Sequence, residues 1–397
     1  MGYKKKIGIS NPPEAERASY KVILVTPDFP PENGGIQNVL YGIAKSMGID
    51  VIAPNSPGAR EFDRKQSFRI YRVPYVKGDK KLSLPFIIVK TILLIRLRRT
   101  DFLICGHILT AIVGVLALKP YIVYTYGMEV TTFRYRLLMR WLMMKAYRVI
   151  TISEFTKKYL LKLGIPLSKI VKIYPVVDMR VFNLGVDETP VVKKYNLYNK
   201  SQGGGMSNKS IMLTVGRMSK EERYKGHDVM IKILPEIIKK IPDVVWVVVG
   251  TGDDYDRFRE DINNLKLSEY VVFTGKVSQE ELAGLYKAAN VFVMPSIEKS
   301  VSEGVKGEGF GIVYIEANAC GTPVVAYKTG GVSEAIIDGV TGILVEQGDS
   351  KKLAESIIKL LLDKKLSEKL GLQGNQRVSK ELNIELLRER FESLIKL

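Results

Sequence analysis

The stretch Gly307-Glu308-Gly309-Phe310-Gly311-Ile312-Val313-Tyr314-Ile315-Glu316-Ala317 places two carboxylates eight positions apart. The glycines disfavour a helix before Phe310, whereas the apolar residues that follow favour one. We therefore expect Glu308 in a loop that opens a helix, and Glu316 one to two turns inside that helix. The first amides of a helix lack intrahelical partners and attract anions. A carboxylate beside such amides suggests a ligand that carries both hydroxyl and phosphate groups.

Short β-rich runs alternate with helical patterns along most of the chain, which is typical of parallel, doubly wound sheets. The alternation pauses at residues 183–209, whose single proline, glycines and polar residues suit a connection and a loop. We therefore expect two Rossmann-like α/β domains, at 1–180 and 181–383, that face each other across a cleft at the carboxyl ends of their strands. The predicted strands are 21–26, 51–53, 69–73, 102–105, 122–125, 149–152, 211–215, 244–249, 271–274, 291–294 and 324–327. The predicted helices are 36–47, 109–118, 133–147, the helix that follows the capping box at 278–281, and those after 350.

The 397-residue chain carries a net charge of +18. All of the excess lies in residues 1–180, which contain 30 Lys and Arg against 12 Asp and Glu. This asymmetry predicts an anionic partner for the first half, either nucleic acid or an anionic membrane surface. The segment 133–148 could form a basic, amphipathic helix on such a membrane, although a packed helix with a solvated basic face explains it equally well. Its basic residues are Arg134, Arg136, Arg140, Lys145 and Arg148, around Trp141.

The cysteines and the apolar stretches indicate where in the cell the protein is expected to work. Cys105 and Cys320 are too few for a disulfide framework and suit a reducing environment. The basic start of the chain is not followed by the apolar stretch of a signal peptide. The stretches 82–95 and 108–118 are shorter than the ~20 residues that a transmembrane helix needs. We expect a cytoplasmic protein, either free or attached peripherally to the inner face of the cell membrane.

The spacing of Glu308 and Glu316 resembles the E-x7-E signature of the GT4-type retaining glycosyltransferases (glycosyl transferases group 1), which have the GT-B fold. The flanking segments are similar to this family across residues 21–349, and their ordered set is far more specific than one motif alone. In GT-B proteins the last helix often returns across the first domain, so we expect residues 384–397 to do so. The matching segments are 30–35 (PPENGG), 215–217 (VGR), 225–228 (KGHD), 319–326 (ACGTPVVA), 329–334 (TGGVSE) and 338–342 (DGVTG).

The resemblance assigns roles to the charged residues of these motifs. It implies that Glu308 binds the hydroxyls of the transferred sugar and that Glu316 binds those of the ribose. Arg217 and Lys225 would neutralise the diphosphate leaving group as the glycosidic bond breaks, Arg through a bidentate fork and Lys as a point charge. Glu308, Arg217 and Lys225 are thus expected to take part both in donor binding and in catalysis.

The resemblance also assigns roles to glycines and to a histidine. Gly34 and Gly35 follow the first strand, where their backbone would approach the donor phosphates. His107 follows the strand at 102–105 and, by resemblance, contacts the donor sugar near the reacting carbon. The amides expected to bind the donor at the helix start are those of Phe310, Gly311 and Ile312.

Several positions depart from the family pattern. Tyr126 stands where relatives commonly carry the histidine of a His-Gly pair, and Val176-Val177-Asp178 stands where many have Asn-Gly-Val-Asp. We call the cations that would bind the diphosphate the phosphate clamp. The loop between Arg217 and Lys225 also contains Lys220 and Arg223, which leaves open which of these cations belongs to the clamp. We interpret His227 as a structural residue that opens a helix.

We interpret the chain as a metal-independent, retaining hexosyltransferase that uses a nucleotide diphosphate sugar. Its acceptor would be lipid-linked or a saccharide, and by resemblance it needs no metal or other cofactor. A glycoside hydrolase or phosphorylase is the first alternative, although the cations of the phosphate clamp would then have no role in the reaction. A Rossmann dehydrogenase is disfavoured because Tyr255 stands where the third glycine of G-x-G-x-x-G belongs. A basic nucleic-acid-binding protein would explain the charge but not the glycine loops, so nucleic acid is not an expected partner.

Overall fold

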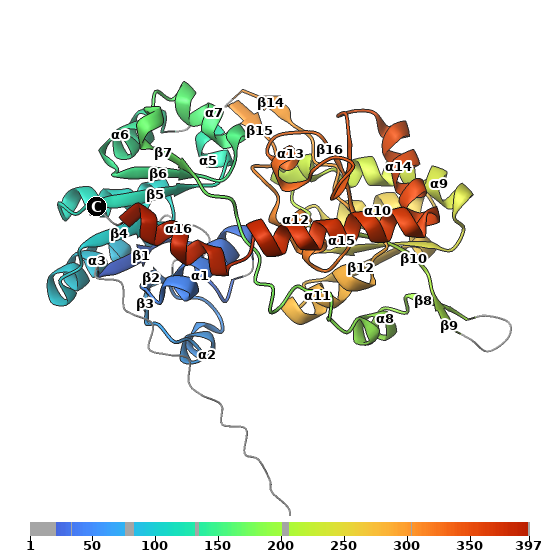
Figure 1. Cartoon of the computed structure of the whole chain (residues 1–397), viewed down its shortest axis with the longest axis horizontal. Coiled ribbons are helices and arrows are strands. Elements are labelled where there is room, and N and C mark those ends of the chain that lie inside the picture. The colour runs from blue at the N-terminus through green and yellow to red at the C-terminus, as the bar shows by residue number, and fades with distance from the viewer. Residues whose placement is uncertain are drawn as a thin grey trace, which may run out of the picture.

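The computed structural model describes residues 21–32, 34–75, 83–131, 135–200, 206–302 and 304–395, which form two α/β domains side by side (Figure 1). Each domain is built on a sheet whose neighbouring strands are all parallel. The interior strand β1 is buried along its whole length, as expected for Val, Ile and Leu in a sheet with helices on both faces. The predicted fold class of two Rossmann-like domains is therefore confirmed.

The described residues of the N-terminal domain form a seven-stranded sheet with the order β3-β2-β1-β4-β5-β6-β7. Its strands are β1 (Val22–Val25), β2 (Asp50–Pro54), β3 (Ile70–Val73), β4 (Phe102–Cys105), β5 (Tyr121–Thr125), β6 (Arg148–Thr151) and β7 (Ile170–Lys172). Its helices are α1 (Gly35–Met47), α2 (Ala59–Arg64), α3 (Leu84–Arg98), η2 (Ile108–Ala111), α4 (Ile112–Leu116), α5 (Met128–Thr131), α6 (Arg136–Lys145), α7 (Glu154–Lys162) and η3 (Leu167–Lys169).

The described residues of the C-terminal domain form a six-stranded sheet with the order β12-β11-β10-β13-β16-β17 and two hairpins, β8-β9 and β14-β15. The strands are β8 (Tyr198–Lys200), β9 (Met206–Asn208), β10 (Ser210–Val215), β11 (Val244–Val249), β12 (Val271–Gly275), β13 (Val291–Val293), β14 (Lys299–Val301), β15 (Gly304–Lys306), β16 (Val324–Tyr327) and β17 (Gly342–Val345). The helices are α8 (Thr189–Lys194), η4 (Lys220–Lys225), α9 (His227–Lys240), α10 (Tyr255–Asn264), η5 (Ser268–Tyr270), α11 (Gln279–Ala288), α12 (Ile312–Ala319), α13 (Val332–Ala335), α14 (Ser350–Leu362) and α15 (Lys364–Glu381). The last helix, α16 (Glu385–Ile395), lies on the N-terminal domain.

The chain crosses between the domains twice, and the two crossings run side by side. The amide of Val177 donates to the carbonyl of Leu382 at 2.8 Å, and the amide of Ile384 donates to the carbonyl of Val177 at 3.0 Å. Helix α16 then packs on α1 of the N-terminal domain (Figure 1). Its buried Leu387 and Phe391 each contribute roughly 1.5–3 kcal/mol relative to exposure. The last helix thus ties the C-terminal domain to the N-terminal one.

Most predicted elements are present, and the capping box before α11 is confirmed, with both of its hydrogen bonds between Ser278 and Glu281. Three differences are informative. The predicted helix at 109–118 is a 3₁₀ turn followed by the short α4, and the predicted loop at 183–209 contains α8 and the hairpin β8-β9. The edge strands β7 and β17 were not predicted, because each is short and pairs with a single neighbouring strand. Arg134, at the start of the predicted basic helix, lies outside the described residues.

Candidate active site

The loop between β15 and α12 carries Glu308. Gly311 is the N-cap of α12, and its φ of 89° lies in the left-handed region that glycine adopts without strain. A Cβ on Gly311 would come within 2.3 Å of the Tyr314 ring. Within the described part of the chain, the amides of Gly311, Ile312 and Val313 donate no hydrogen bond. The start of α12 therefore offers unpaired amides of the kind that bind phosphate at a helix N-terminus, and two of them, those of Gly311 and Ile312, are among the three predicted from the sequence.

A charge cluster lies beside this loop. The Nζ of Lys225 lies 3.6 Å from Oε2 of Glu308 and 3.9 Å from Oε2 of Glu222. The Nη2 of Arg217 lies 2.5 Å from Oε1 of Glu222. The structure thus brings three predicted residues together, with Glu222 as a bridge that the sequence did not suggest. Among the described residues, Oε2 of Glu222 and Oε2 of Glu308 are buried without a hydrogen-bond partner, so both can accept from ligand hydroxyls.

The other arginine of this loop belongs to a different cluster. Arg223 forms a bidentate pair with Asp254, with both nitrogen–oxygen distances at 2.8 Å. Arg257 also donates to Asp254, whose side chain is 1% exposed. The hydrogen bonds from Arg257, and then those from Arg223, hold the pKa of Asp254 well below its usual range. Arg223 is therefore engaged in holding the loop on α10, whereas Lys225 contacts Glu308 and Glu222, and Arg217 contacts Glu222.

The second predicted carboxylate is inside the domain. Glu316 is the fifth residue of α12 and is 3% exposed, and its Oε2 accepts a hydrogen bond from Oη of Tyr286 at 3.0 Å. Burial raises the pKa of Glu316 to about 7, although the bond from Tyr286 opposes part of this effect. Glu316 and Glu308 therefore serve different partners and do not form a single carboxylate pair. Tyr286 is a neighbour that no motif indicated.

The glycine loop of the N-terminal domain lies against α12. Gly34 is the N-cap of α1, and Gly35 is its first residue. A Cβ on Gly35 would lie 3.4 Å from Cγ2 of Ile312, so only a backbone or a very small side chain fits between the two helix starts. The N-termini of α1 and α12 are therefore neighbours across the domain boundary. Phe310, also predicted at this site, is buried, with its ring 5.4 Å from the ring of Tyr174.

The segment that departs from the family pattern lies against the loop of Glu308, across the domain boundary. A Cβ on Gly309 would lie 2.1 Å from the carbonyl oxygen of Tyr126. A Cβ on Gly127 would lie 3.3 Å from Cα of Gly309. The ring of Tyr126 stacks on that of Tyr124, with centroids 5.0 Å apart. Glu129 accepts a hydrogen bond from the Tyr126 amide, so its carboxylate helps to shape this turn.

His107 lies at the end of β4, as the sequence predicts, and is the N-cap of η2. Its Nδ1 accepts a hydrogen bond from the amide of Leu109 at 3.1 Å. A nitrogen that accepts carries no proton, so in the neutral imidazole the proton is on Nε2. His107 is thus oriented as an Nε2–H donor.

His227, in contrast, is a core residue, as expected. It is the first residue of α9 and is 2% exposed, and its ring packs 5.2 Å from that of Phe258. Burial lowers the pKa of His227 to about 3, and Lys225 contributes to this shift. The imidazole is therefore neutral at physiological pH and adds no charge beside the clamp.

A polar cluster that the sequence did not reveal joins the domains near the same loop. Glu334 of α13 accepts from the hydroxyl of Tyr174 at 3.0 Å and from Nζ of Lys172 at 3.2 Å. Its other carboxylate oxygen accepts from the amide of Glu154 at 2.6 Å. The amide of Gly331, just before α13, donates to the carbonyl of Glu308 at 2.9 Å. The loop that carries Glu308 is therefore fixed to the segment that holds the N-terminal domain.

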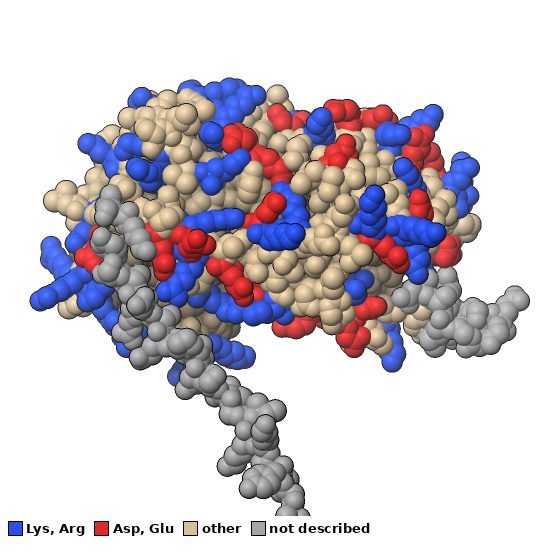
Figure 2. All heavy atoms as spheres, in the orientation of Figure 1, with Lys and Arg blue, Asp and Glu red and all other residues tan. Residues whose placement is uncertain are grey.

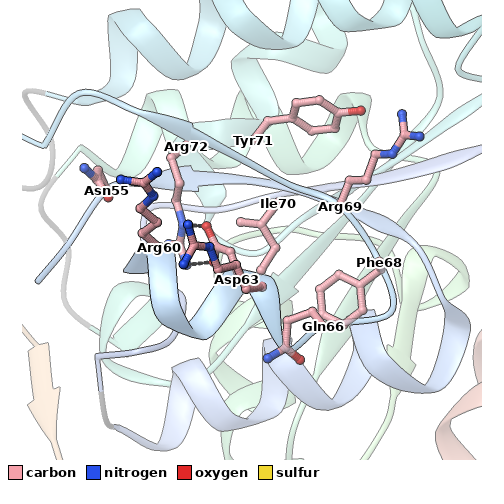
Figure 3. Close-up of a pocket in the computed structure, with 10 residues that line it drawn as sticks. Asn55, Arg60, Asp63, Gln66, Phe68, Arg69, Ile70, Tyr71 and Arg72 are labelled. Carbon is pink, nitrogen blue, oxygen red and sulfur yellow. Dashed lines mark hydrogen bonds and ion pairs between the residues drawn. The ribbon is translucent and has the colours of Figure 1, made fainter. Parts of the chain in front are cut away.

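Two surface hollows lie elsewhere. One, of about 630 Å³, lies beside β3 and α2 (Figure 3). Figure 3 shows Arg60 and Arg69 at opposite ends of this hollow, while Arg72 is bound to Asp63. Arg72 also donates to two backbone carbonyls, so it is a structural residue. The second hollow, of about 590 Å³, lies beside Lys145 and Arg148. Neither hollow includes the charge cluster, which lies next to the interdomain contact of Gly309 and is the better candidate for the functional site.

No group of three or more His, Cys, Asp and Glu residues in the described ranges could hold a metal ion. None of the helices that the structure describes combines the length and the apolar character needed to cross a bilayer.

Family profiles cover both domains. The profile described as Glycosyltransferase Family 4 matches residues 33–181, and the profile described as Glycosyl transferases group 1 matches residues 199–377. The chain is 30% identical over 374 residues to the GDP-mannose-dependent alpha-(1-6)-phosphatidylinositol monomannoside mannosyltransferase of Mycolicibacterium smegmatis. This similarity covers 89% of the chain and 92% of that relative. The Mycobacterium tuberculosis protein of the same description is 27% identical over 409 residues, which is 95% of this chain and 98% of that one.

Solved structures agree on the fold. Anabaena Alr3699/HepE in complex with UDP and glucose superposes with a TM-score of 0.79 at 20% identity, over 95% of this chain and all of that one (100%). WaaG, a glycosyltransferase involved in lipopolysaccharide biosynthesis, superposes with a TM-score of 0.69 at 15% identity, over 94% of this chain and 99% of that one. At these identities the likeness shows a shared two-domain fold.

Proposed function

Since this chain belongs to glycosyltransferase family 4, whose profiles match both of its domains, we propose that it transfers a hexose from a nucleotide diphosphate sugar to a lipid-linked acceptor. The observation that carries the proposal is the position of Lys225 between Glu308 and Glu222, beside the unpaired first amides of α12. Cations and amides there suit a diphosphate, and carboxylate oxygens suit sugar hydroxyls.

In the proposed complex the diphosphate occupies the space between Arg217, Lys225 and the start of α12. Its charge replaces the carboxylate of Glu222 as the partner of Arg217. As the bond between the anomeric carbon and the phosphate oxygen breaks, Arg217 and Lys225 stabilise the developing negative charge. These two cations support a mechanism that needs no metal ion, because they supply the positive charge that a metal supplies elsewhere.

We propose that the anomeric configuration is retained. The acceptor hydroxyl would attack the face from which the diphosphate leaves, so that a new carbon–oxygen bond forms where the old one breaks. The leaving phosphate oxygen would take the proton of that hydroxyl, which requires no protein base. Glu308 would hold the hydroxyls of the sugar and Glu316 those of the ribose. The Nε2–H of His107 would donate a hydrogen bond to the transferred sugar near the reacting carbon.

For the donor and the acceptor, the full-length relatives suggest what to test first. The Mycolicibacterium smegmatis and Mycobacterium tuberculosis relatives are described as using GDP-mannose and a phosphatidylinositol monomannoside. We therefore propose GDP-mannose as the first donor to test and a phosphoglycolipid as the acceptor class, ahead of a soluble saccharide. Such an acceptor remains in a membrane, so the protein would work as a peripheral protein at the inner, cytoplasmic face.

A thermal-shift screen of nucleotide diphosphate sugars tests this function. A ligand that binds only the folded protein raises its stability by RT ln(1 + [L]/Kd), about 2.7 kcal/mol at a hundredfold excess over Kd. We expect GDP and GDP-mannose to raise the melting temperature, with UDP-glucose, UDP-N-acetylglucosamine and ADP-glucose as comparison ligands. Lys225→Ala should abolish the shift. If no nucleotide diphosphate or nucleotide sugar stabilises the natural chain, the proposed function is wrong.

A further inference from the structure

Helix α3 is apolar on two opposite faces, and the fold buries only one of them. Ile87, Leu94 and Ile95 lie in the core of the N-terminal domain. The other face exposes Phe86 (46%), Val89 (60%), Leu93 (51%) and Leu97 (79%), a stripe at the three- and four-residue spacing of one helix side. The outer face of a surface helix is normally polar. At 15 residues, α3 is also shorter than the ~20 residues needed to span a bilayer.

Two neighbouring helices extend this surface. Helix α4 contacts both α3 and α6, so the three helices lie next to one another on one side of the sheet. Helix α4 ends in Leu116, with Leu118 just beyond it (90% exposed), and α6 exposes Leu137 (83%) and Trp141 (43%). We name the exposed apolar residues of these three helices the α3–α4–α6 surface. They are Phe86, Val89, Leu93, Leu97, Leu116, Leu118, Leu137, Leu138 and Trp141.

The charged residues of the segment that forms this surface are mostly basic, and Asp50 pairs with Arg98 of α3 at 3.9 Å. Residues 83–150 contain 10 Lys and Arg but only two acidic residues, Asp101 and Glu129. Of these, Glu129 accepts a backbone hydrogen bond inside the interdomain turn and does not lie with the exposed cations. Arg96 on α3 and Lys145 on α6 are exposed. Figure 2 shows tan and blue side chains, with little red, around α6 at the upper left.

We propose that the α3–α4–α6 surface docks on an anionic lipid bilayer, with its leucines and Trp141 in the headgroup and acyl boundary and its Lys and Arg at the lipid phosphates. Exposed apolar side chains inside a basic rim have the chemistry of an interfacial membrane contact. A nucleic acid would match the charge but would leave the leucine stripe unpaired. A second copy of the chain would match the stripe but would bring two basic rims together. The inference deepens the proposed function, on which it rests for the lipid-linked acceptor.

Vesicle sedimentation with the full chain, without nucleotide, tests the proposal. Vesicles of phosphatidylcholine mixed with phosphatidylglycerol should bind the protein, and vesicles of phosphatidylcholine alone should bind it weakly. Binding should fall as salt is raised from about 50 to about 500 mM, because salt screens the basic rim. The double change Arg96→Gln with Lys145→Gln should weaken binding to the anionic vesicles several-fold, while salt should affect the remaining binding less.

The apolar stripe has a matched control in the other domain. Leu93→Glu with Leu97→Glu should lower binding to anionic vesicles at least about tenfold, because it removes two inserted side chains and adds two negative charges. Leu362→Glu with Leu372→Glu places the same changes at positions with 68% and 50% exposure on α14 and α15. This control should bind like the natural chain. Both variants alter exposed residues, and a melting temperature near that of the natural chain confirms that each is folded.

Several outcomes would overturn the proposal. They are equal vesicle binding by the stripe variant and the natural chain, equal binding to charged and uncharged vesicles, and tighter binding to duplex DNA than to anionic vesicles. Concentration-dependent dimers in sedimentation velocity that the stripe variant loses would assign the surface to a second copy instead. Calorimetry with GDP and GDP-mannose in the absence of lipid reports on the proposed function separately. Failure of one proposal is therefore distinguishable from failure of the other.

Discussion

Gly309 and Tyr126 belong to different domains, yet no side chain fits on Gly309, because its Cβ would lie 2.1 Å from the carbonyl oxygen of Tyr126. Gly309 directly follows Glu308, whose carboxylate faces Lys225. The approach of the two domains and the position of a predicted catalytic carboxylate are therefore coupled through one peptide unit. Any change that separates the domains at this point also moves Glu308.

We expect Gly309→Ala to reduce turnover by about 100-fold, because its methyl group has to displace the Tyr126 carbonyl and with it the loop that bears Glu308. Steady-state transfer assays with a melting curve measure the effect. Gly307→Ala is the matched control in the same loop, since its nearest neighbour would be an ordinary contact at 3.6 Å. Equal activity of the two variants would contradict a role for the Gly309–Tyr126 contact.

Arg217→Ala should lower kcat by about 100-fold or more, the usual loss when one stabiliser of developing charge is removed. Single-turnover measurements isolate the chemical step. Arg223→Ala is the control from the same loop, because Arg223 pairs with Asp254 and not with the charge cluster. It should lower the melting temperature and leave kcat near its natural value. Near-natural turnover of Arg217→Ala would remove Arg217 from the mechanism.

The two carboxylates of the motif should affect different ligands. Glu316→Gln should weaken the binding of GDP and of GDP-mannose by a similar factor, because the ribose is common to both. The loss should be roughly tenfold, since hydrogen bonds to a charged group contribute about 1.5–3 kcal/mol. Glu308→Gln should weaken GDP-mannose and leave GDP almost unchanged. Isothermal titration calorimetry measures the binding of GDP and of GDP-mannose to each of the two variants. Equal losses for both ligands in both variants would show that the two assignments are wrong.

The buried Glu316 should make stability depend on pH. Burial raises its pKa from 4.5 to about 7. Between these values the folded protein holds a proton that the unfolded chain has released, so the free energy of unfolding falls as pH rises. Glu316→Gln lacks this titration, and its stability relative to the natural chain should increase between pH of about 4.5 and about 7, by at most about 3 kcal/mol.

Denaturant unfolding at several pH values measures this difference, and Tyr286→Phe provides the control. Tyr286 donates to the Glu316 carboxylate, and this bond favours the charged form. Without the bond the pKa of Glu316 should rise further, so the loss of stability should extend to higher pH. A stability difference between Glu316→Gln and the natural chain that stays constant from pH 4 to about 8 would show that Glu316 does not titrate in this window.

The elements that the sequence predicted well are those whose local pattern is decisive. β1 and β11 are uninterrupted runs of Val, Ile, Leu and Trp, and such strands are buried on both faces whatever their neighbours. The capping box before α11 is likewise local, since both bonds join residues three apart. β7 and β17 were not predicted because they are short edge strands whose hydrogen bonds come from β6 and β16. The residues of β7 and β17 do not by themselves indicate that these partner strands are present.

The sequence alone determined the motif residues: the glycine loop before α1, the loop and helix from Glu308 to Glu316, and the cations Arg217 and Lys225. Order along the chain and residue type are enough for such inferences, because a glycine-rich strand-to-helix turn is a local structure. Only the tertiary structure separated Arg223 from the clamp, placed Glu222 within it and left one face of α3 open. These outcomes depend on contacts between residues far apart in the sequence, or between side chains with several possible partners. For α3 the decisive fact is that one helix can bury only one of its two apolar faces against the sheet.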